Sequence, residues 1–389
     1  MHTIFTLIPL LSMLIIGCGS KASDSAASSD YQTPLMEGTG CESIPLYGNP
    51  TNPAERGPWP VGVQTVSLGR LDVEVLYPAV VGSEEGRPPM EFDVRYVLPE
   101  SEREKVTDEV RPNQSCDCYT DLPVDADHGP YPLVLFVHGT ASWRTQSLSL
   151  MEHWASRGFV VASADHPGLA LSDILGGVCG LPTSGPQDLS GDLEAILTGF
   201  REGDAGLDFL ESRVDLNRIA VIGHSAGANA ATEAAALDGV QVVISMAGSG
   251  STDVSDLDSA LFLGAMADDV VSFSRTQAAY EATAAPRRLV GISGGGHLIF
   301  SDICELTNDD GKDLVEIATE SGVCGTQFAS LLFDCDANTI PAPDSKAIVK
   351  RASTWELETQ LHCDDSLNAF DDFGDRNSWI EVLESASGE

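Results

Sequence analysis

The chain has 389 residues, of which 42% are hydrophobic, so it can bury a sizeable core as one large domain or two small ones. Its 59 acidic and 21 basic residues give a formal net charge of -38. This excess of negative charge argues against binding to nucleic acid or to an anionic membrane surface, because no basic patch is available to neutralise phosphate groups.

The N-terminus is typical of an exported protein. Residues 4–16 form a mostly apolar run that is too short for a transmembrane helix and suits the core of a signal peptide. The run ends in Ile-Ile-Gly-Cys at Cys18, which resembles the lipobox of bacterial lipoproteins and implies lipid attachment to Cys18 after cleavage. A plain secretory signal and an uncleaved anchor are the alternatives. We expect residues 1–18 to be this signal, residues 19–40 to be a flexible tether, and the protein to lie in the cell envelope or to be secreted.

The chain has nine cysteines, and eight remain when Cys18 is set aside. An even number in an exported chain predicts disulfides, although eight cysteines allow about 105 pairings and leave the connectivity open. Only one residue separates Cys116 from Cys118, so we expect each to pair elsewhere. The sequence has no C-x-x-C pair, which argues against a zinc site.

The first predicted elements are a hairpin and a long insertion. Residues 63–68 and 71–77 alternate apolar and polar side chains, which predicts an antiparallel hairpin at a sheet edge. Residues 80–130 contain several prolines and clustered charges. We expect them to be a loop insertion over a site, with one helix over residues 100–110.

Apolar runs then alternate with helical stretches, which predicts an α/β fold with a mostly parallel sheet and helices on both faces. We expect strands at 133–137, 159–162, 219–223, 240–246, 261–264 and, as the last one, 289–292. Helices are expected at 146–157, 189–214 and 226–237, with a loop at 169–188. We interpret residues 41–389 as one domain whose extension, 304–389, has a cysteine-rich part that fits no recognisable pattern.

The sequence Gly223-His224-Ser225-Ala226-Gly227 lies between a predicted buried strand and an alanine-rich helix. This is the context that a G-x-S-x-G nucleophile elbow requires, since the sharp turn leaves no room for side chains at the two glycines. Ser225 is therefore the candidate nucleophile, and an ordinary tight turn is the alternative.

A serine hydroxyl needs a base to take its proton and an acid to orient that base. Enzymes with a nucleophile elbow place these residues in the order Ser, Asp or Glu, His. His297 follows the last predicted strand and three glycines, and Asp268 and Asp269 follow the strand before it. The sequence predicts that His297 is the base and that one of the two aspartates is the acid.

The oxyanion of such a reaction is bound by two backbone amides. One is expected at Ala226, directly after the nucleophile. The other is expected at Thr140, in the loop after the strand that ends near residue 137. Trp143 is close enough in sequence to form a wall of the acyl pocket, although it could simply pack in the core.

The chain resembles the α/β-hydrolase superfamily. The stretches Phe136-Val137-His138-Gly139-Thr140-Ala141-Ser142-Trp143-Arg144 and Ile292-Ser293-Gly294-Gly295-Gly296-His297 look like the platelet-activating-factor acetylhydrolase branch and its bacterial esterase and polyester-hydrolase neighbours. The resemblance covers roughly residues 60–305. In such relatives the acid follows a glycine by a few residues and is itself followed by one variable residue and then by apolar residues. This pattern implies that Asp268, rather than Asp269, is the acid. The absence of an H-G-G-G motif argues against the hormone-sensitive-lipase branch.

The resemblance implies hydrolysis of carboxylic esters through an acyl-enzyme, with no cofactor and no metal. The negative charge favours a neutral substrate, such as a short-chain acyl ester, a lipid or a polyester. An amidase or peptidase with the same triad is the alternative enzyme. A catalytically silent surface-binding protein and a structural envelope protein are the alternatives outside enzymes. We expect no nucleic-acid partner, and contact with a membrane only through an N-terminal lipid anchor.

Overall fold

The computed structural model describes residues 35–36, 44–45, 48–204, 206–331 and 333–387. The chain divides into two units, Met1–Gln32 and Thr33–Glu389, and the described residues belong to the second. The predicted signal, Cys18 and most of the predicted tether therefore lie outside the described residues. Within the described ranges, no helix combines the length and the apolar character needed to cross a membrane.

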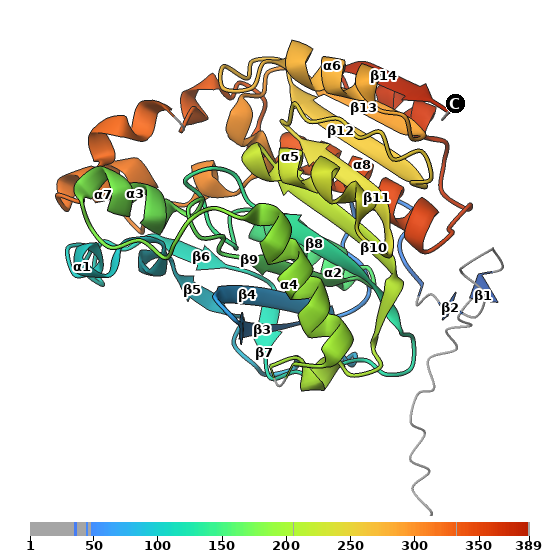
Figure 1. The fold of residues 1–389 in the computed structure, drawn as a ribbon, viewed down its shortest axis with the longest axis horizontal. Helices are drawn as coiled ribbons and strands as arrows, with labels where there is room; N and C mark the ends of the chain where they lie inside the picture. The colour runs from blue at the N-terminus through green and yellow to red at the C-terminus, as the bar shows by residue number, and fades with distance from the viewer. Residues whose placement is uncertain (1–34, 37–43, 46–47, 205, 332, 388–389) are drawn as a thin grey trace, which may run out of the picture. The chain divides into compact units, whose positions relative to one another are not determined.

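A ten-stranded sheet forms the centre of the fold (Figure 1). Strands β8 to β13 run parallel to one another, which confirms the predicted mostly parallel sheet. The predicted hairpin is also present near one edge, where β3 pairs antiparallel with β4. The strands, in spatial order, are β14 (Ile380–Ala386), β13 (Arg287–Ile292), β12 (Ser259–Ala265), β11 (Val240–Met246), β10 (Val214–His224), β8 (Tyr131–Val137), β9 (Val160–Ala164), β4 (Leu71–Pro78), β3 (Val61–Leu68) and β7 (Cys118–Thr120).

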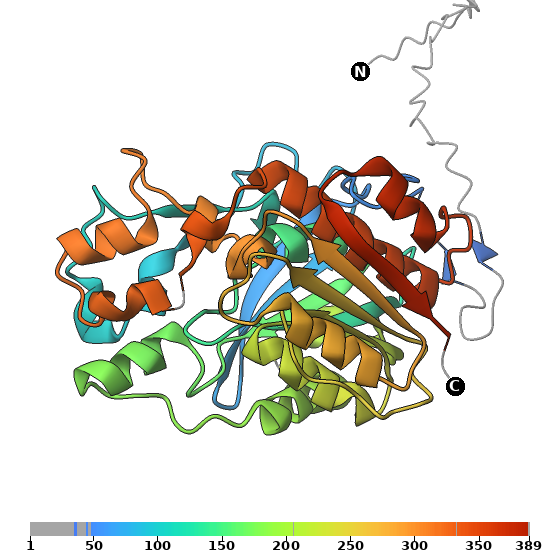
Figure 2. The ribbon, with the colours of Figure 1, turned by 90° about the horizontal axis from the view of Figure 1, so that it is seen from above.

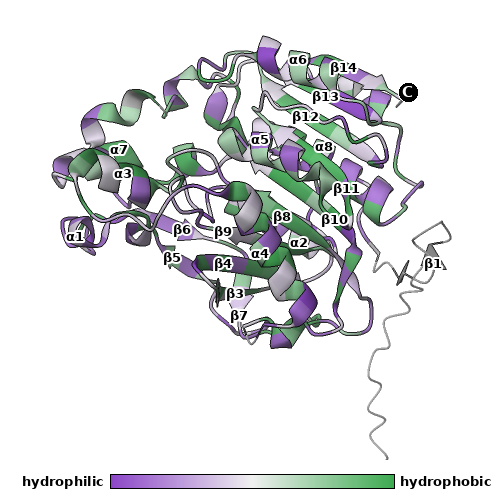
Figure 3. Cartoon of the chain, in the orientation of Figure 1, coloured by the Kyte–Doolittle hydropathy of each residue, from purple (hydrophilic) through white to green (hydrophobic). Residues whose placement is uncertain are grey.

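Helices cover both faces of the sheet, as predicted. Helices α2 (Leu148–Ser156) and α8 (Ala342–Leu361) share one buried apolar cluster with Val134 and Phe136 of β8. Helices α4 (Leu189–Glu202), α5 (Ala226–Glu233) and α6 (Phe273–Ala282) share a second cluster with the alternate residues of β8, because successive strand side chains point to opposite faces. Figure 3 shows the resulting hydrophobic central strands between helices with polar outer faces.

The segments predicted as loops contain further elements. Residues 80–130 hold an antiparallel pair, β5 (Glu91–Asp93) with β6 (Asn113–Ser115), and helix α1 spans only Glu100–Arg103 instead of residues 100–110. Residues 171–179 form helix α3 (Leu171–Cys179), where a loop was predicted. The predicted helix at 189–214 ends at Glu202, and β10 starts at Val214. Leucine and isoleucine spacing in α3 is compatible with a helix, and a run of only nine residues is easily read as a loop.

A small cap lies over one end of the sheet. It consists of residues 91–115, helix α3 and residues 303–333, which include helix α7 (Leu314–Glu320). These segments, far apart in sequence, gather at the same side in both views (Figures 1 and 2). They share a third apolar cluster that includes Val97, Trp143 and Ile317. The cap therefore has a small core of its own beside the main one.

Disulfides hold the cap segments. Cys179 at the end of α3 pairs with Cys324 after α7, and Cys304 pairs with Cys335. The expectation that Cys116 and Cys118 pair elsewhere is wrong, because the structure joins them to each other with their Cα atoms 5.1 Å apart. These two residues lie where the chain turns from β6 into β7, and the turn brings their side chains together.

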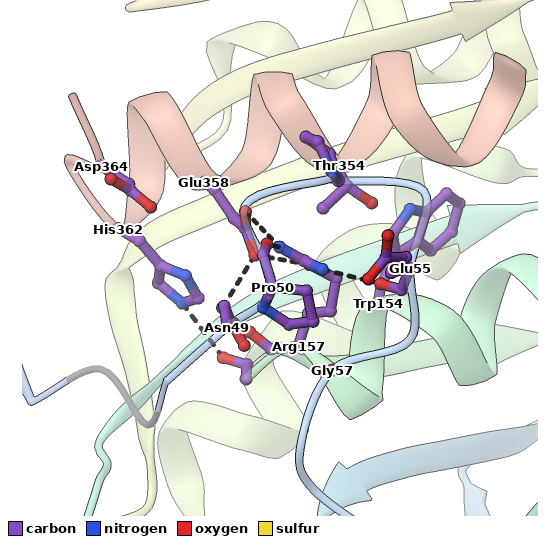
Figure 4. A network of polar contacts seen from close by, with 12 residues as sticks. Asn49, Pro50, Glu55, Gly57, Trp154, Arg157, Thr354, Glu358, His362 and Asp364 are labelled. Carbon is purple, nitrogen blue, oxygen red and sulfur yellow. Dashed lines mark hydrogen bonds and ion pairs between the residues drawn. The ribbon is translucent and has the colours of Figure 1, made fainter. Parts of the chain in front are cut away.

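The C-terminal extension completes the fold. Helix α8 packs on the sheet, and β14 adds an antiparallel strand to β13, so the strand at 289–292 is not the last. Glu358 of α8 accepts hydrogen bonds from the Arg157 guanidinium at 2.7 and 2.9 Å and from Asn49 at 2.8 Å (Figure 4). Both charged side chains are completely buried. This network ties α8 to the end of α2 and to the N-terminal segment.

Candidate active site

A sharp turn at Ser225 joins β10 to α5, so the predicted strand and helix lie on either side of the G-x-S-x-G sequence. Ser225 has φ 57 and ψ -117, an unusual conformation for a residue with a side chain. Its N–H donates to the Met246 carbonyl at 2.9 Å. A Cβ atom on Gly223 would lie 2.0 Å from the Gly227 carbonyl oxygen, and one on Gly227 would lie 2.1 Å from the Val137 carbonyl oxygen. Both glycines are therefore required by close backbone contacts, and strain is concentrated at the serine.

Asp268 and His297 lie in contact beyond β12 and β13. The His297 Nδ1–H donates to Asp268 Oδ2 at 2.8 Å, since a carboxylate can only accept. The other carboxylate oxygen of Asp268 accepts from the Val270 and Val271 amides at 2.8 and 2.7 Å. Asp269 is exposed to solvent instead. The arrangement fixes the imidazole with its Nε2 lone pair available for a proton.

Ser225 and His297 line the same small pocket, together with the loop after β8 and with Leu298, Ile303 and Phe333. Among the described residues, no hydrogen bond joins the serine hydroxyl to the imidazole; such contacts are often loose in sites without substrate. The described part of the chain also contains no cluster of three or more His, Cys, Asp or Glu side chains with metal-binding geometry.

Some backbone amides around this pocket already donate hydrogen bonds to residues that the structure describes, and others do not. The Gly139 N–H donates to Gln146 Oε1 at 2.9 Å, and the Ala141 N–H donates to the Leu169 carbonyl at 2.9 Å. Thr140 lies between them, and no hydrogen bond among the described residues uses its N–H. On the other side, Ala226 is the first residue of α5, where amides have no partner within the helix. The role of the Thr140 and Ala226 amides as oxyanion donors stays a prediction.

A hydrogen-bonded relay connects the three loops of the site. Gln146 accepts from Gly139 and donates from Nε2 to His224 Nδ1 at 3.2 Å. The His224 Nε2–H donates to the His297 carbonyl at 3.0 Å. All three side chains, those of Gln146, His224 and His297, are buried, and burial followed by the neighbouring His297 holds the pKa of His224 well below its ordinary value. His224 is therefore a neutral link between the nucleophile strand and the histidine loop.

His138 fixes the loop that carries Thr140. Its Nδ1–H donates to the Gly139 carbonyl at 2.8 Å, and its Nε2 accepts from the His166 amide at 3.2 Å. Burial lowers the pKa of His138 to about 3, so the ring stays neutral and keeps this tautomer. His138 and His224 therefore serve as neutral supports of the loops around Ser225.

The C-terminal extension holds the histidine loop from outside. Asp334 accepts from the His297 amide at 2.7 Å, and Asn338 accepts from the Gly296 amide at 2.8 Å. The Cys304–Cys335 disulfide anchors this segment. Sequence analysis did not identify Gln146, Asp334 or Asn338. The only sequence signal near Asp334 and Asn338 was Cys335. A cysteine predicts a disulfide there, but it does not indicate that its neighbours bind the histidine loop.

Comparisons with known proteins relate one segment of the sequence to a family and the fold to a solved structure. Residues 100–170 match the family model of platelet-activating factor acetylhydrolase, isoform II. No curated protein sequence matches the chain. A solved structure, the ferulic acid esterase from Streptomyces cinnamoneus, is similar with a TM-score of 0.55 and 20% sequence identity, over 86% of this chain and 97% of that one. The chain is therefore similar over residues 100–170 to platelet-activating factor acetylhydrolase, isoform II, and it shares its fold with an esterase of known structure.

Proposed function

We propose that the protein is an exported serine esterase in which Ser225 is the nucleophile, His297 the general base and Asp268 the acid that orients it. The observation that carries the proposal is the convergence of two features on one pocket. These are a serine in the strained conformation of a nucleophile elbow and a histidine hydrogen-bonded to a buried carboxylate. Each feature alone occurs in structural roles, whereas together they meet the requirements of a serine hydrolase.

In the first step, Ser225 Oγ attacks the ester carbonyl while His297 Nε2 takes the hydroxyl proton. The Thr140 and Ala226 amides donate to the oxyanion that forms, and Asp268 stabilises the imidazolium. Collapse of the tetrahedral intermediate breaks the bond to the alcohol oxygen. His297 returns the proton to this oxygen, which leaves Ser225 acylated.

In the second step, water attacks the acyl-enzyme with His297 again as the base. The new oxyanion occupies the same two amides, and its collapse releases the carboxylic acid and restores Ser225. The relay through Gln146 and His224 keeps the amides and the base in fixed positions during both steps. Only residues of this chain and water take part.

A neutral carboxylic ester is the substrate class that we propose. The matched family and the similar solved structure both carry ester hydrolysis in their names, as an acetylhydrolase and a ferulic acid esterase. The formal charge of -38 would repel a strongly anionic substrate. Lipid, short-chain acyl and polyester substrates all remain within this class.

We also propose that Cys18 carries a lipid and that the enzyme acts in the cell envelope or is secreted. The disulfides of the cap support an oxidising compartment, since such bonds rarely persist in a reducing cytosol. Metabolic labelling with a clickable fatty acid tests this: the wild-type protein should be labelled and Cys18→Ser should not. Labelling of neither protein in cells that lipidate other lipoproteins would contradict the anchor.

Hydrolysis of nitrophenyl esters and the matching anilides tests the enzymatic proposal. We expect ester turnover by the wild-type protein and a loss of about 10⁶-fold in kcat for Ser225→Ala. Asp268→Asn should lower kcat by about 10⁴-fold, whereas the neighbouring exposed Asp269→Asn is the matched control and should leave it unchanged. Faster cleavage of anilides than of esters would favour an amidase. Equal effects of the two Asn substitutions would contradict the proposed acid.

A further inference from the structure

An apolar cavity of about 130 Å³ lies inside the cap. Each of the three cap segments contributes a wall, through Val97 and Leu98 of the insertion, Ile174 and Leu175 of α3, and Ile317 and Ala318 of α7. The Cys179–Cys324 disulfide joins two of these walls. The cavity is thus built from two segments that were predicted as loops and from the cysteine-rich part of the extension, and a disulfide links two of them.

The cavity adjoins the catalytic pocket. Ala141 and Phe333 line both spaces, and Trp143 lines the cavity directly after the oxyanion loop. Neither His297 nor Ser225 lines the cavity. A substrate group in the cavity would therefore lie on the side of the Thr140 amide. The alcohol oxygen, which must receive a proton from His297, would lie on the other side.

We infer that this cavity binds the acyl group of the substrate, and that the group is apolar and larger than acetyl, with about six carbon atoms as a chain or a ring. The inference rests on the proposed ester hydrolysis and narrows its substrate class. The estimate of about six carbon atoms comes from comparison with another protein, in which a dry apolar cavity of about 150 Å³ binds benzene. The lining is dominated by aliphatic and aromatic side chains, which offer an apolar group close contacts.

The cavity also has an apolar opening. Val178 and Phe328 line it and are nevertheless 49% and 48% exposed. Together they give the rim of the cavity an apolar surface, and a contiguous apolar surface can mark a ligand-binding groove. A longer acyl chain can extend between these two side chains into solvent. We therefore expect kcat/KM to rise with acyl length up to about six carbons and then to level off.

The test compares nitrophenyl esters of acetate, butyrate, hexanoate, octanoate and benzoate on the full-length, oxidised protein. We expect kcat/KM to rise by about fourfold for each methylene group that becomes buried, up to hexanoate. Ala318→Phe would place a ring in the cavity. It should lower kcat/KM for hexanoate and benzoate at least tenfold while leaving acetate within about twofold. Thr319→Phe, on the exposed side of the same helix, is the matched control and should behave as wild type.

A second series keeps the acetyl group and lengthens the alcohol. If Ala318→Phe affects this series and not the acyl series, the cavity binds the alcohol and the inference is wrong. If the wild type hydrolyses acetate in a Ser225-dependent way but shows no dependence on acyl length, the inference is also wrong and the proposed function stands. If no ester is hydrolysed and a fluorophosphonate does not label Ser225, the proposed function itself fails.

Binding without turnover provides an independent measurement. Isothermal titration of Ser225→Ala with methyl hexanoate should detect binding with a negative heat-capacity change, and Ala318→Phe in the same background should abolish it. Equal binding to both proteins would place the ester outside the cavity and overturn the inference.

Discussion

Replacing Gln146 by leucine tests whether the relay holds the oxyanion loop. Gln146 is completely buried and makes two bonds within the site, accepting from the Gly139 amide and donating to His224. Leucine has a similar volume but neither polar atom. The substitution would leave the Gly139 N–H and His224 Nδ1 buried without these partners. Gly139 directly precedes Thr140, so the loop that bears the proposed oxyanion donor would lose its main support.

The expected loss of stability follows from the Gly139 N–H and His224 Nδ1, and the expected loss of kcat follows from the displaced loop. Each buried polar group left unsatisfied costs about 1–3 kcal/mol, so the free energy of unfolding should fall by about 2–6 kcal/mol. Removal of an oxyanion donor lowers kcat by about 10²–10³-fold. Gln146→Leu would displace the Thr140 amide without removing it, so its effect on kcat should not exceed this range. We therefore expect kcat for nitrophenyl acetate to drop by about 10- to 100-fold, with a smaller change in KM.

Urea unfolding and steady-state kinetics on the folded fraction measure both effects. Gln114→Leu is the matched control, because Gln114 is a buried amide with two hydrogen bonds to Thr145 and does not line the catalytic pocket. It should destabilise the protein comparably while leaving kcat near the wild-type value. Wild-type turnover by folded Gln146→Leu, or an equal loss in both variants, would refute the relay.

Three further predictions concern the extension and the buried charges. Asp334→Ala should lower kcat by about 10- to 100-fold through displacement of His297, and Asp334→Asn, which can still accept from the His297 amide, should restore it. Failure of the asparagine variant to rescue turnover would contradict a positioning role. Glu358→Ala should lower the free energy of unfolding by about 3–5 kcal/mol in urea, because the buried Arg157 loses its carboxylate; a loss below about 1 kcal/mol would show that the pair is not desolvated. Burial lowers the pKa of His362 to about 3, whereas it is about 6.5 in an unfolded chain. Between these values only the unfolded state binds this proton, so stability falls as the pH falls from about 6.5 towards 3. His362→Gln should flatten this slope by up to about 1.4 kcal/mol per pH unit, and an unchanged slope would contradict the assignment.

The central sheet was predictable from sequence because its signals are local. Continuous apolar runs such as residues 133–137 are typical of buried parallel strands. The elbow was equally visible, since Gly223 and Gly227 are required by backbone contacts one turn away. The candidate acid and base could also be found from sequence, because each follows a predicted strand and the two come after Ser225 in the expected order.

The cap was not predictable, because its elements are short and depend on partners distant in sequence. Helix α3 has nine residues and is held by a disulfide to Cys324, 145 residues away. The pairing of Cys116 with Cys118 likewise depends on the turn between two three-residue strands. Asp334 acts through a carboxylate that accepts one backbone amide, and no pattern in the sequence distinguishes it from the many surface acids.

The most direct test of the account is to identify the residue that a fluorophosphonate probe modifies. The full-length, oxidised protein would be treated with the probe, digested and mapped by peptide mass spectrometry. Our account predicts a single modified serine, Ser225, with labelling abolished in His297→Ala and retained in Asp269→Asn. Modification of a different serine, or none in a protein that hydrolyses nitrophenyl esters, would contradict a Ser225 nucleophile and with it the proposed mechanism.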